Sequence, residues 1–267
     1  MDSFKNTIQT IKKYIPTAIK LSFRTILKGR PKLKAENLNP LNMCLCCGSA
    51  SLIETPVLWE SLINGWELSA AETDYINRQQ GLHCQRCKTR LRGMTLAYAM
   101  MRMNSYQGFY KDFVKTTWMR RKKILEINRA DWLTQYLNQV PGHILCSYPE
   151  VDIQKLPYAD NSFDIVVHSD TLEHVEDPLQ AMRECQRVLK PNGFCAFTTP
   201  VVVDRLTRSR AGLSPSYHGT ENQISEDYLV HTEFGADVWK LAFQAGFTEV
   251  CTYSLEYPAG LAFVFIK

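Results

Sequence analysis

Residues 152–200 read DIQKLPYADNSFDIVVHSDTLEHVEDPLQAMRECQRVLKPNGFCAFTTP, and their pattern alternates between strands and a helix. Residues 164–168 are apolar and rich in β-branched side chains, which is typical of a parallel strand buried on both faces. The next helix is predicted to begin after Asp177, a residue type that caps helix N-termini, and to end at residues 190–193, which include a proline and a glycine. Residues 194–199 are the following strand. This order is the second half of a doubly wound α/β domain, in which ligands bind at the strand ends.

Several linked elements of this segment resemble the class I methyltransferases that use S-adenosylmethionine, in particular the methyltransferase type 11 group. The shared pattern is carried, in the same order, by residues 156–158 (LPY), 161–164 (NSFD), 172–175 (LEHV), 177–178 (DP) and 187–193 (RVLKPNG). The resemblance implies a Rossmann-like α/β sheet of seven strands and S-adenosylmethionine as the cofactor. A doubly wound domain without methyl transfer is the alternative, because a fold does not by itself determine a function.

In this family the first strand ends in an acidic residue, followed by a glycine-rich turn that lies against the methionine part of the cofactor. The resemblance places the acid at Glu126 and the first two glycine positions at Asn128 and Ala130. Asparagine tolerates a left-handed backbone conformation, and alanine is small. Trp132, at the third glycine position, departs from the pattern and is interpreted as the start of the next helix. As an alternative role, Glu126 can form a salt bridge with the basic residues that precede the strand.

The second strand is expected near residues 143–148, and it lacks the terminal acid that holds the ribose hydroxyls in the family. Asp152 and Ile153 match the acidic and apolar pair that flanks the adenine at the third strand. His168 and Ser169, at the end of the fourth strand, complete the predicted cofactor site. The departures at the first two strands leave a second function open, a catalytically inactive methyltransferase-like scaffold that binds a partner through its cysteine module and basic arm.

Methyl transfer to a hydroxyl or amine needs a group that receives the proton of the acceptor. His218, in the Tyr-His-Gly element of residues 217–219, is the first choice for this general base, and His174 is the second. A solvated or packed histidine is the competing interpretation at both positions. Acceptors in the resembling group are often sugars or lipid-linked glycans, so the resemblance implies a small-molecule or glycan acceptor. A third function, methylation of a nucleic-acid base, is disfavoured because the Asn/Asp-Pro-Pro-Tyr/Phe element of such enzymes is missing.

Two CxxC steps precede this domain, at residues 44–47 and 84–87. Two residues between thiols allow both sulfur atoms to reach one tetrahedral ion, so the spacing predicts a structural zinc held by Cys44, Cys47, Cys84 and Cys87. Four thiolates leave no open position on the ion, and such a metal stabilises the fold without taking part in catalysis. Cys46 and His83 are spare candidate ligands, and buried free thiols or a redox pair are the alternatives.

The separation between the two CxxC steps exceeds the usual spacing of a zinc ribbon and predicts a helical insert at residues 70–80, capped by Ser69. A zinc ribbon ahead of a methyltransferase half also resembles a bacterial group in which the second CxxC is followed by basic and apolar residues. Arg90, Leu91 and Arg92 fit that continuation. Residues 96–103 are predicted to be a helix that packs this module on the main domain.

The N-terminal residues are strongly basic. Residues 1–34 contain nine Lys or Arg residues and one acid, whereas the remainder of the chain has a net charge of −4. Residues 3–28 predict a basic amphipathic helix, which can lie on an anionic membrane surface or pack on its own domain or a partner. No nucleic-acid partner is expected, because the rest of the chain is acidic and offers no matching basic surface.

The chain of 267 residues is therefore predicted to consist of a basic amphipathic arm and linker (1–40), a zinc-ribbon-like module (41–104) and a class I methyltransferase-like domain (105–267). It has no apolar run of about 20 residues and no apolar core of a signal peptide. These features and an odd number of cysteines, nine, predict a cytoplasmic protein, with peripheral contact to the inner face of a membrane through residues 3–28.

Overall fold

The computed structural model describes residues 42–219 and 225–267, which belong to one compact unit. The boundary predicted between residues 104 and 105 falls inside this unit. The amphipathic helix predicted at residues 3–28 lies outside the described residues. Among the helices of the described ranges, none combines the length and the apolar character that crossing a membrane requires.

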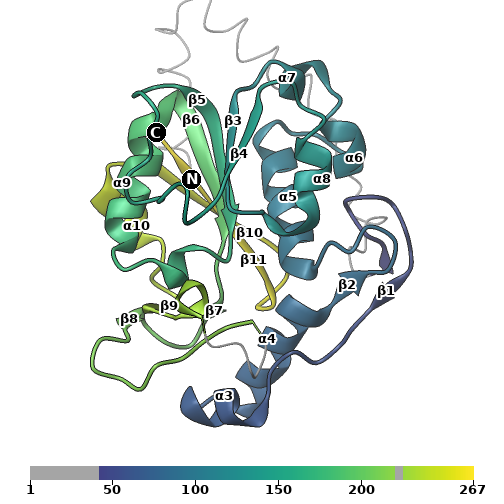
Figure 1. The fold of residues 1–267 in the computed structure, drawn as a ribbon. Coiled ribbons are helices and arrows are strands. Elements are labelled where there is room, and N and C mark those ends of the chain that lie inside the picture. Colours follow the sequence, from purple (N-terminus) through teal and green to yellow (C-terminus); the bar gives the residue numbers. More distant parts are fainter. Residues whose placement is uncertain (1–41, 220–224) are drawn as a thin grey trace, which may run out of the picture. The chain divides into compact units, whose positions relative to one another are not determined.

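A six-stranded sheet forms the centre of the unit (Figure 1). Its strands are, in order across the sheet, β10 (Glu249–Glu256), β11 (Gly260–Ile266), β6 (Leu189–Thr198), β5 (Phe163–Ser169), β3 (Ile124–Ile127) and β4 (His143–Cys146). The pairs β6–β5, β5–β3 and β3–β4 are parallel, whereas β11 pairs antiparallel with both β6 and β10. The α/β sheet predicted from the sequence is therefore present as a mixed sheet, with the long β5 and β6 at its middle.

The prediction of seven strands is wrong for the described residues, and the strand expected at Asp152 is a turn. Residues 147–162 form the whole connection between β4 and β5 and contain only turns and bends. A parallel strand outside β4 would need a crossover of about a dozen residues to reach it. A second crossover back to β5 would have to fit into the same short segment, so the third strand has no room to form.

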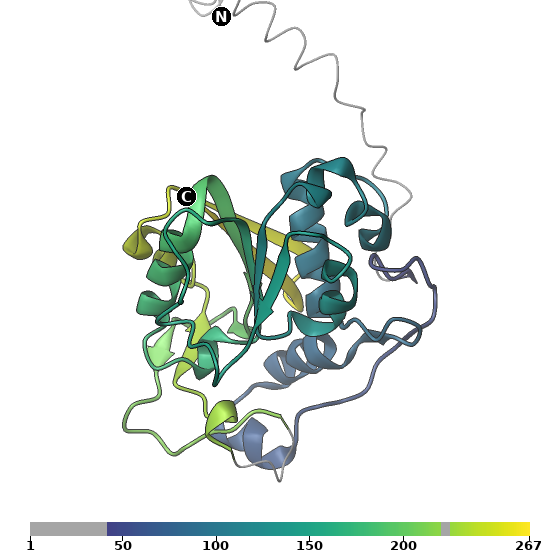
Figure 2. The same ribbon diagram turned by 45° about the horizontal axis from the view of Figure 1, so that its top comes forward.

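Helices cover both faces of the sheet (Figure 2). One face packs against α9 (Pro178–Val188) and α10 (Lys240–Ala245), and the other packs against α5 (Leu91–Met103). Successive strand residues point to opposite faces. Ile124 accordingly lies in the core on the α5 side and Leu125 in the core on the α9 side. The predicted helix at residues 96–103 is confirmed as part of α5.

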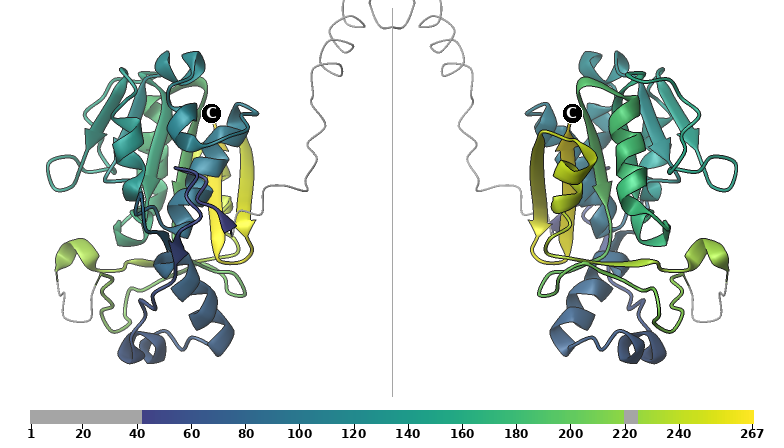
Figure 3. Two further views of the ribbon diagram at one scale, coloured as in Figure 1. Left: turned by 90° about the vertical axis from the view of Figure 1, so that its right-hand side faces the viewer. Right: turned by 90° about the vertical axis from the view of Figure 1, so that its left-hand side faces the viewer.

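Short elements complete the fold around this sheet. They are β1 (Leu52–Ile53), α3 (Glu60–Gly65), α4 (Ala70–Gly81), β2 (His83–Cys84), α6 (Tyr110–Phe113), α7 (Thr117–Arg120), η2 (Asp131–Leu133), α8 (Thr134–Leu137), η3 (Leu172–His174), β7 (Val201–Val202), β8 (Arg208–Ser209), η4 (Glu226–Tyr228) and β9 (Thr232–Gly235). Ser69 caps α4 with a capping box, as the sequence predicted. Helices α3 and α4 and the small sheet β7–β9–β8 lie beyond the same end of the strands of the six-stranded sheet (Figure 1, Figure 3).

Candidate functional site

A cavity of about 940 Å³ lies at the ends of β3 and β5. Its wall comes from the turns after β3, β4 and β5, from residues 57–68 around α3, and from residues 218–219 and 226–231. The carboxyl ends of parallel strands are the place where doubly wound domains bind their ligands. The volume is also in the range of cofactor and small-molecule sites.

Most of the residues predicted for the cofactor and the acceptor meet at this cavity. Those that line it are Asn128, Asp152, Ile153, Ser169, His174 and His218. Three others, Glu126, Ala130 and His168, are buried nearby but do not line it. The structure therefore brings the candidate residues of both roles to one site and separates three of them from it.

The turn after β3 is built around Asn128, whose backbone is left-handed with φ of +54°. Its side-chain amide joins the ends of three strands, because Nδ2 donates to Thr171 Oγ1 at 3.4 Å and Oδ1 accepts from the backbone N–H of Tyr148 at 3.1 Å. Trp132 is 47% exposed, begins its helix as interpreted from the sequence, and does not line the cavity. The large residue at the third glycine position therefore leaves the cavity open.

Glu126 is fully buried in a network of its own beneath this turn. Oε1 accepts hydrogen bonds from the backbone N–H of Ala130 at 2.8 Å and from the hydroxyl of Thr134, and Oε2 lies 2.7 Å from His143 Nε2. The interaction predicted with the preceding basic residues does not form. The carboxylate is committed to holding the turn and β4, and in this structure it does not face the cavity.

His168 lies in the core because it points to the opposite face of the sheet from Ser169. Its ring stacks on Phe197 with centroids 5.0 Å apart, and burial lowers its pKa to about 3. Ser169 lines the cavity and shares a hydrogen bond of 2.7 Å with Thr198 at the end of β6. The end of β5 thus offers Ser169 and not His168 to a ligand.

The turn after β4 offers no acid at the strand end, as the sequence predicted. Tyr148, Asp152 and Gln154 are polar residues that this turn contributes to the wall. Asp152 Oδ1 accepts from the backbone N–H of Gln154 at 2.8 Å, which fixes the turn that replaces the third strand. Ile153 lies beside it with its side chain buried. The acidic and apolar pair predicted to flank an adenine is therefore present on the cavity wall.

A compact cluster of Glu173, His174 and His218 lies on another part of the wall. Glu173 and His174 belong to the turn η3 that follows β5, and His218 comes from the segment after β6. His174 Nδ1 donates to the carbonyl of Leu229 at 2.9 Å. The rings of His174 and His218 are 5.3 Å apart in a T-shaped arrangement. The structure therefore brings the two histidines predicted as general bases together, and adds an acid that the sequence reasoning missed.

Burial dominates the ionisation of this cluster. It raises the pKa of Glu173 to about 7, lowers the pKa of His174, and lowers the pKa of His218 to about 3. Both rings are accordingly neutral near pH 7. The sequence signal for Glu173 is its place as the acid of the LEHV element, immediately after a strand end.

Arg92 links the segment that carries the two CxxC steps to the cavity. Its guanidinium is hydrogen-bonded to the Asp170 carboxylate and to the Gln80 side chain, and its Nη2 atom lies 3.9 Å from Asp131 Oδ1. Arg90 and Arg92, the basic residues that follow the second CxxC step, therefore both line the cavity. Arg92 and Asp170 both line the site.

A second ion pair fixes the part of the wall near α4. Arg205 binds both oxygens of Glu72, at 2.8 and 2.9 Å, and also donates to the carbonyls of Trp66 and Glu67. The Arg205 guanidinium lowers the pKa of Glu72 to about 2. This bidentate pair holds the segment after β6 against the α3–α4 region.

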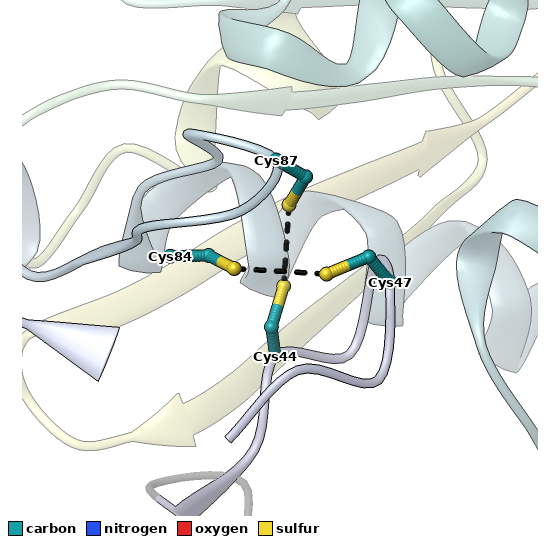
Figure 4. Close-up of side chains that lie close together, drawn as sticks. All are labelled: Cys44, Cys47, Cys84 and Cys87. Atoms are coloured by element: carbon teal, nitrogen blue, oxygen red, sulfur yellow. Dashed lines mark hydrogen bonds between the residues drawn. The ribbon is translucent and has the colours of Figure 1, made fainter. Parts of the chain in front are cut away.

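The four predicted metal ligands converge in a separate cluster (Figure 4). Their sulfur atoms all lie within 4.8 Å of one another, with 3.5 Å between those of Cys44 and Cys87 and 3.6 Å between those of Cys47 and Cys84. A tetrahedral zinc with Zn–S bonds of about 2.3 Å requires S···S distances of about 3.8 Å. The four thiols therefore fit a zinc ion, and Cys46 and His83 are not part of the cluster.

The cysteine cluster belongs to the main core. Its four residues are buried and pack in the same apolar cluster as Met94 and Met100 of α5 and as Ile124 of β3. Strands β1 and β2 pair antiparallel next to it, with Leu52 opposite Cys84. An ion at this place would therefore stabilise both the cysteine turns and the face of the sheet that α5 covers.

Comparison with known proteins relates part of the chain to methyltransferases. Residues 122–197 match a family model described as a methyltransferase domain. The relatives found by sequence include S-adenosylmethionine-dependent methyltransferases. A probable S-adenosylmethionine-dependent methyltransferase of Mycolicibacterium smegmatis is 33% identical over 128 residues, covering 45% of this chain and 44% of that protein. The glycine/sarcosine/dimethylglycine N-methyltransferase of Actinopolyspora halophila is 34% identical over 87 residues, covering 33% and 14%. The chain spans less than half the length of the curated relatives it matches.

Among solved structures, an S-adenosylmethionine-dependent methyltransferase from Thermotoga maritima, described as a possible histamine N-methyltransferase, is similar with a TM-score of 0.38 and 14% identity. The similarity covers 66% of this chain and 90% of that one. The family model and the names of these relatives associate this part of the chain with S-adenosylmethionine-dependent methyltransferases. They confirm the similarity predicted for the methyltransferase half.

Proposed function

We propose that the protein is an S-adenosylmethionine-dependent methyltransferase that acts on a small-molecule or glycan acceptor bound in the 940 Å³ cavity. The observation that carries the proposal is the meeting of two sets of residues at this cavity. Asn128, Asp152 and Ile153 form the part that matches a cofactor site, and Glu173, His174 and His218 form a reactive cluster on the same wall.

The strand ends fit the cofactor in two respects. The left-handed turn at Asn128 lets the backbone after β3 approach a ligand, and Trp132 is turned away from the space that the ligand would use. Asp152 and Ile153 would hold the adenosine end, with the carboxylate as a hydrogen-bond acceptor and the buried isoleucine against the ring. When bound, S-adenosylmethionine supplies a methyl group on a positively charged sulfur.

The protein contributes position and proton transfer to such a reaction. The transfer is an in-line displacement, in which the acceptor oxygen or nitrogen forms a bond to the methyl carbon as the carbon–sulfur bond breaks and the acceptor proton leaves. His174 is suited to receive that proton, because Nδ1 donates to Leu229 and Nε2 therefore carries a lone pair. His218, 5.3 Å away between ring centroids, would position the acceptor or take the same role.

We also propose that Cys44, Cys47, Cys84 and Cys87 hold a structural zinc ion. The distances between their sulfur atoms and their place in the core of the sheet support this role. The ion would keep Arg90 and Arg92, which follow Cys87 in the sequence, at the cavity wall. It would take no part in the methyl transfer, since four thiolates leave no open position for a substrate.

A methyl-transfer assay tests this function. With radiolabelled S-adenosylmethionine and a panel of sugars, nucleotide sugars and glycolipids, we expect label in one acceptor class and release of S-adenosylhomocysteine. The His174→Ala variant is expected to lose about 100-fold or more in kcat, because it lacks the proton acceptor. Tyr257→Ala, at a residue that is 71% exposed and does not line the cavity, is the control and should keep full activity. Equal rates for His174→Ala and the wild type would contradict the role of this cluster.

A further inference from the structure

Two hydrogen-bond acceptors face each other in the reactive cluster. His174 Nε2 lies 3.7 Å from Glu173 Oε1. Nε2 of the neutral ring has no proton, because Nδ1 donates to the carbonyl of Leu229. Glu173 Oε2 accepts from Thr199 at 3.1 Å, whereas Oε1 has no partner although the residue is only 2% exposed. A buried carboxylate oxygen opposite a lone pair is unfavourable unless a proton or a metal ion lies between them.

His218 brings a third donor to the same point. One ligand atom each from Glu173, His174 and His218 can be chosen so that all three lie within 4.8 Å of one another. The three residues come from two segments, the turn after β5 and the segment after β6, and all three line the cavity. The donor set is therefore one carboxylate oxygen and two imidazole nitrogens on a wall that a substrate can reach.

We propose that Glu173, His174 and His218 bind a divalent transition-metal ion at the cavity wall. Two imidazoles and one carboxylate are a common donor set for such ions, and three protein ligands leave coordination positions open toward the cavity. The surroundings already provide the outer partners that metal sites use. The Leu229 carbonyl orients the His174 ring, and the Thr199 hydroxyl orients the Glu173 carboxylate so that Oε1 remains free.

The neighbouring cations do not occupy this place, because each has its own acids. Arg92 is paired with Asp170 and lies near Asp131. Arg210 is paired with Glu233, and its guanidinium also lies over the Trp66 ring. Among the described residues, the free oxygen of Glu173 is therefore left without a cationic side chain bonded to it. A metal ion satisfies both Oε1 and the lone pair of His174 at once.

The role of this ion rests on the proposed function. A hydroxyl of the acceptor bound at an open position of the ion would lose its proton more readily, since a divalent ion lowers the pKa of a bound oxygen. The proton would pass to water, the oxygen would form the bond to the methyl carbon, and the carbon–sulfur bond would break to release S-adenosylhomocysteine. Two adjacent hydroxyls of a sugar would suit two open positions. With the ion bound, the Nε2 lone pair of His174 is used for coordination, so the ion replaces His174 in removing the acceptor proton, and loss of His174 lowers the rate in either case.

Binding of Mn²⁺ tests the site without reference to activity. The protein carrying one zinc ion per chain, which the four thiolates bind in preference, is titrated with Mn²⁺, and free Mn²⁺ is followed by electron paramagnetic resonance, because thiolates are poor ligands for Mn²⁺. We expect one Mn²⁺ per chain. Glu173→Gln and His218→Ala should each weaken binding at least about 10-fold. His231→Gln is the matched control, since His231 lines the same cavity but is not in the cluster, and it should bind Mn²⁺ as the wild type does.

The outcomes separate this proposal from the proposed function. Absence of saturable Mn²⁺ binding to the folded wild type, or equal binding by the wild type, Glu173→Gln and His218→Ala, would overturn the metal site. Circular dichroism of each variant verifies that it is folded, and the conservative Glu173→Gln change keeps the proposal testable if His218→Ala is unstable. If Glu173→Gln no longer binds Mn²⁺ but transfers methyl groups at the wild-type rate, the proposed function stands and the role of the metal ion is overturned.

Discussion

Replacement of Cys84 by serine is expected to abolish stoichiometric zinc binding and to destabilise the whole unit of residues 40–267. Structural zinc contributes about 10–16 kcal/mol to the folding of small zinc-binding peptides. The cysteine cluster shares its core with α5 and β3, so its loss is not confined to the cysteine turns. We expect the melting temperature to fall by roughly 10 °C or more, since each kcal/mol corresponds to about 2–4 °C in a protein of this size. Metal analysis and thermal denaturation of the purified variant measure both effects.

Cys46→Ala is the matched control for this prediction. Cys46 is buried in the same turn but is not one of the four convergent thiols. It should therefore retain one zinc per chain and lose only the stability expected for a small buried side chain. The zinc site would be contradicted by wild-type protein that contains no zinc after expression with added zinc, or by equal loss of zinc in Cys46→Ala and Cys84→Ser.

Replacement of Glu126 by alanine is expected to cost about 3–5 kcal/mol of stability, because it removes one partner of a buried, hydrogen-bonded group. The change would leave the backbone N–H of Ala130, the hydroxyl of Thr134 and the ring of His143 without their shared acceptor. The turn after β3 and the pairing of β3 with β4 depend on these bonds. Urea denaturation at pH 7 measures the loss.

The Glu126→Gln variant distinguishes this structural role from the role that family resemblance implies. A glutamine keeps the size and one acceptor oxygen, so we expect a smaller loss of stability and an affinity for S-adenosylmethionine within about 3-fold of the wild type. A carboxylate that held the amino group of the cofactor would behave differently. In that case Glu126→Gln would keep its stability and lose most of its affinity, which would contradict the network seen here.

The regular elements could be predicted because their signals are local. The apolar run before Ser169, the cap at Asp177 and the capping box at Ser69 each depend on residues that are close in sequence. The CxxC spacing likewise constrains the geometry within a single turn. With two such turns in the chain, the prediction of one four-cysteine cluster requires only that they meet each other. Local patterns of this kind can be recognised even where the chain is only distantly similar to known proteins.

The parts that were missed depend on contacts between distant segments. Nothing in the residues around Glu126 shows that Thr134 and His143 bond to it, so the sequence predicts only the cofactor contact that the family resemblance implies. The third strand was expected from the match at Asp152, although residues 147–162 are too few to build it. The sequence marks Glu173 only as part of the LEHV element, because His218, the residue that completes its cluster, comes from another segment.

Calorimetric titration of the zinc-loaded protein with S-adenosylmethionine measures whether the cavity binds this cofactor. We expect saturable binding with a Kd in the micromolar range, about −8 kcal/mol, and a loss of affinity of about 10-fold or more in Asp152→Ala. Absence of binding up to millimolar S-adenosylmethionine, in a sample shown to be folded, would contradict the assignment of the cavity to this cofactor.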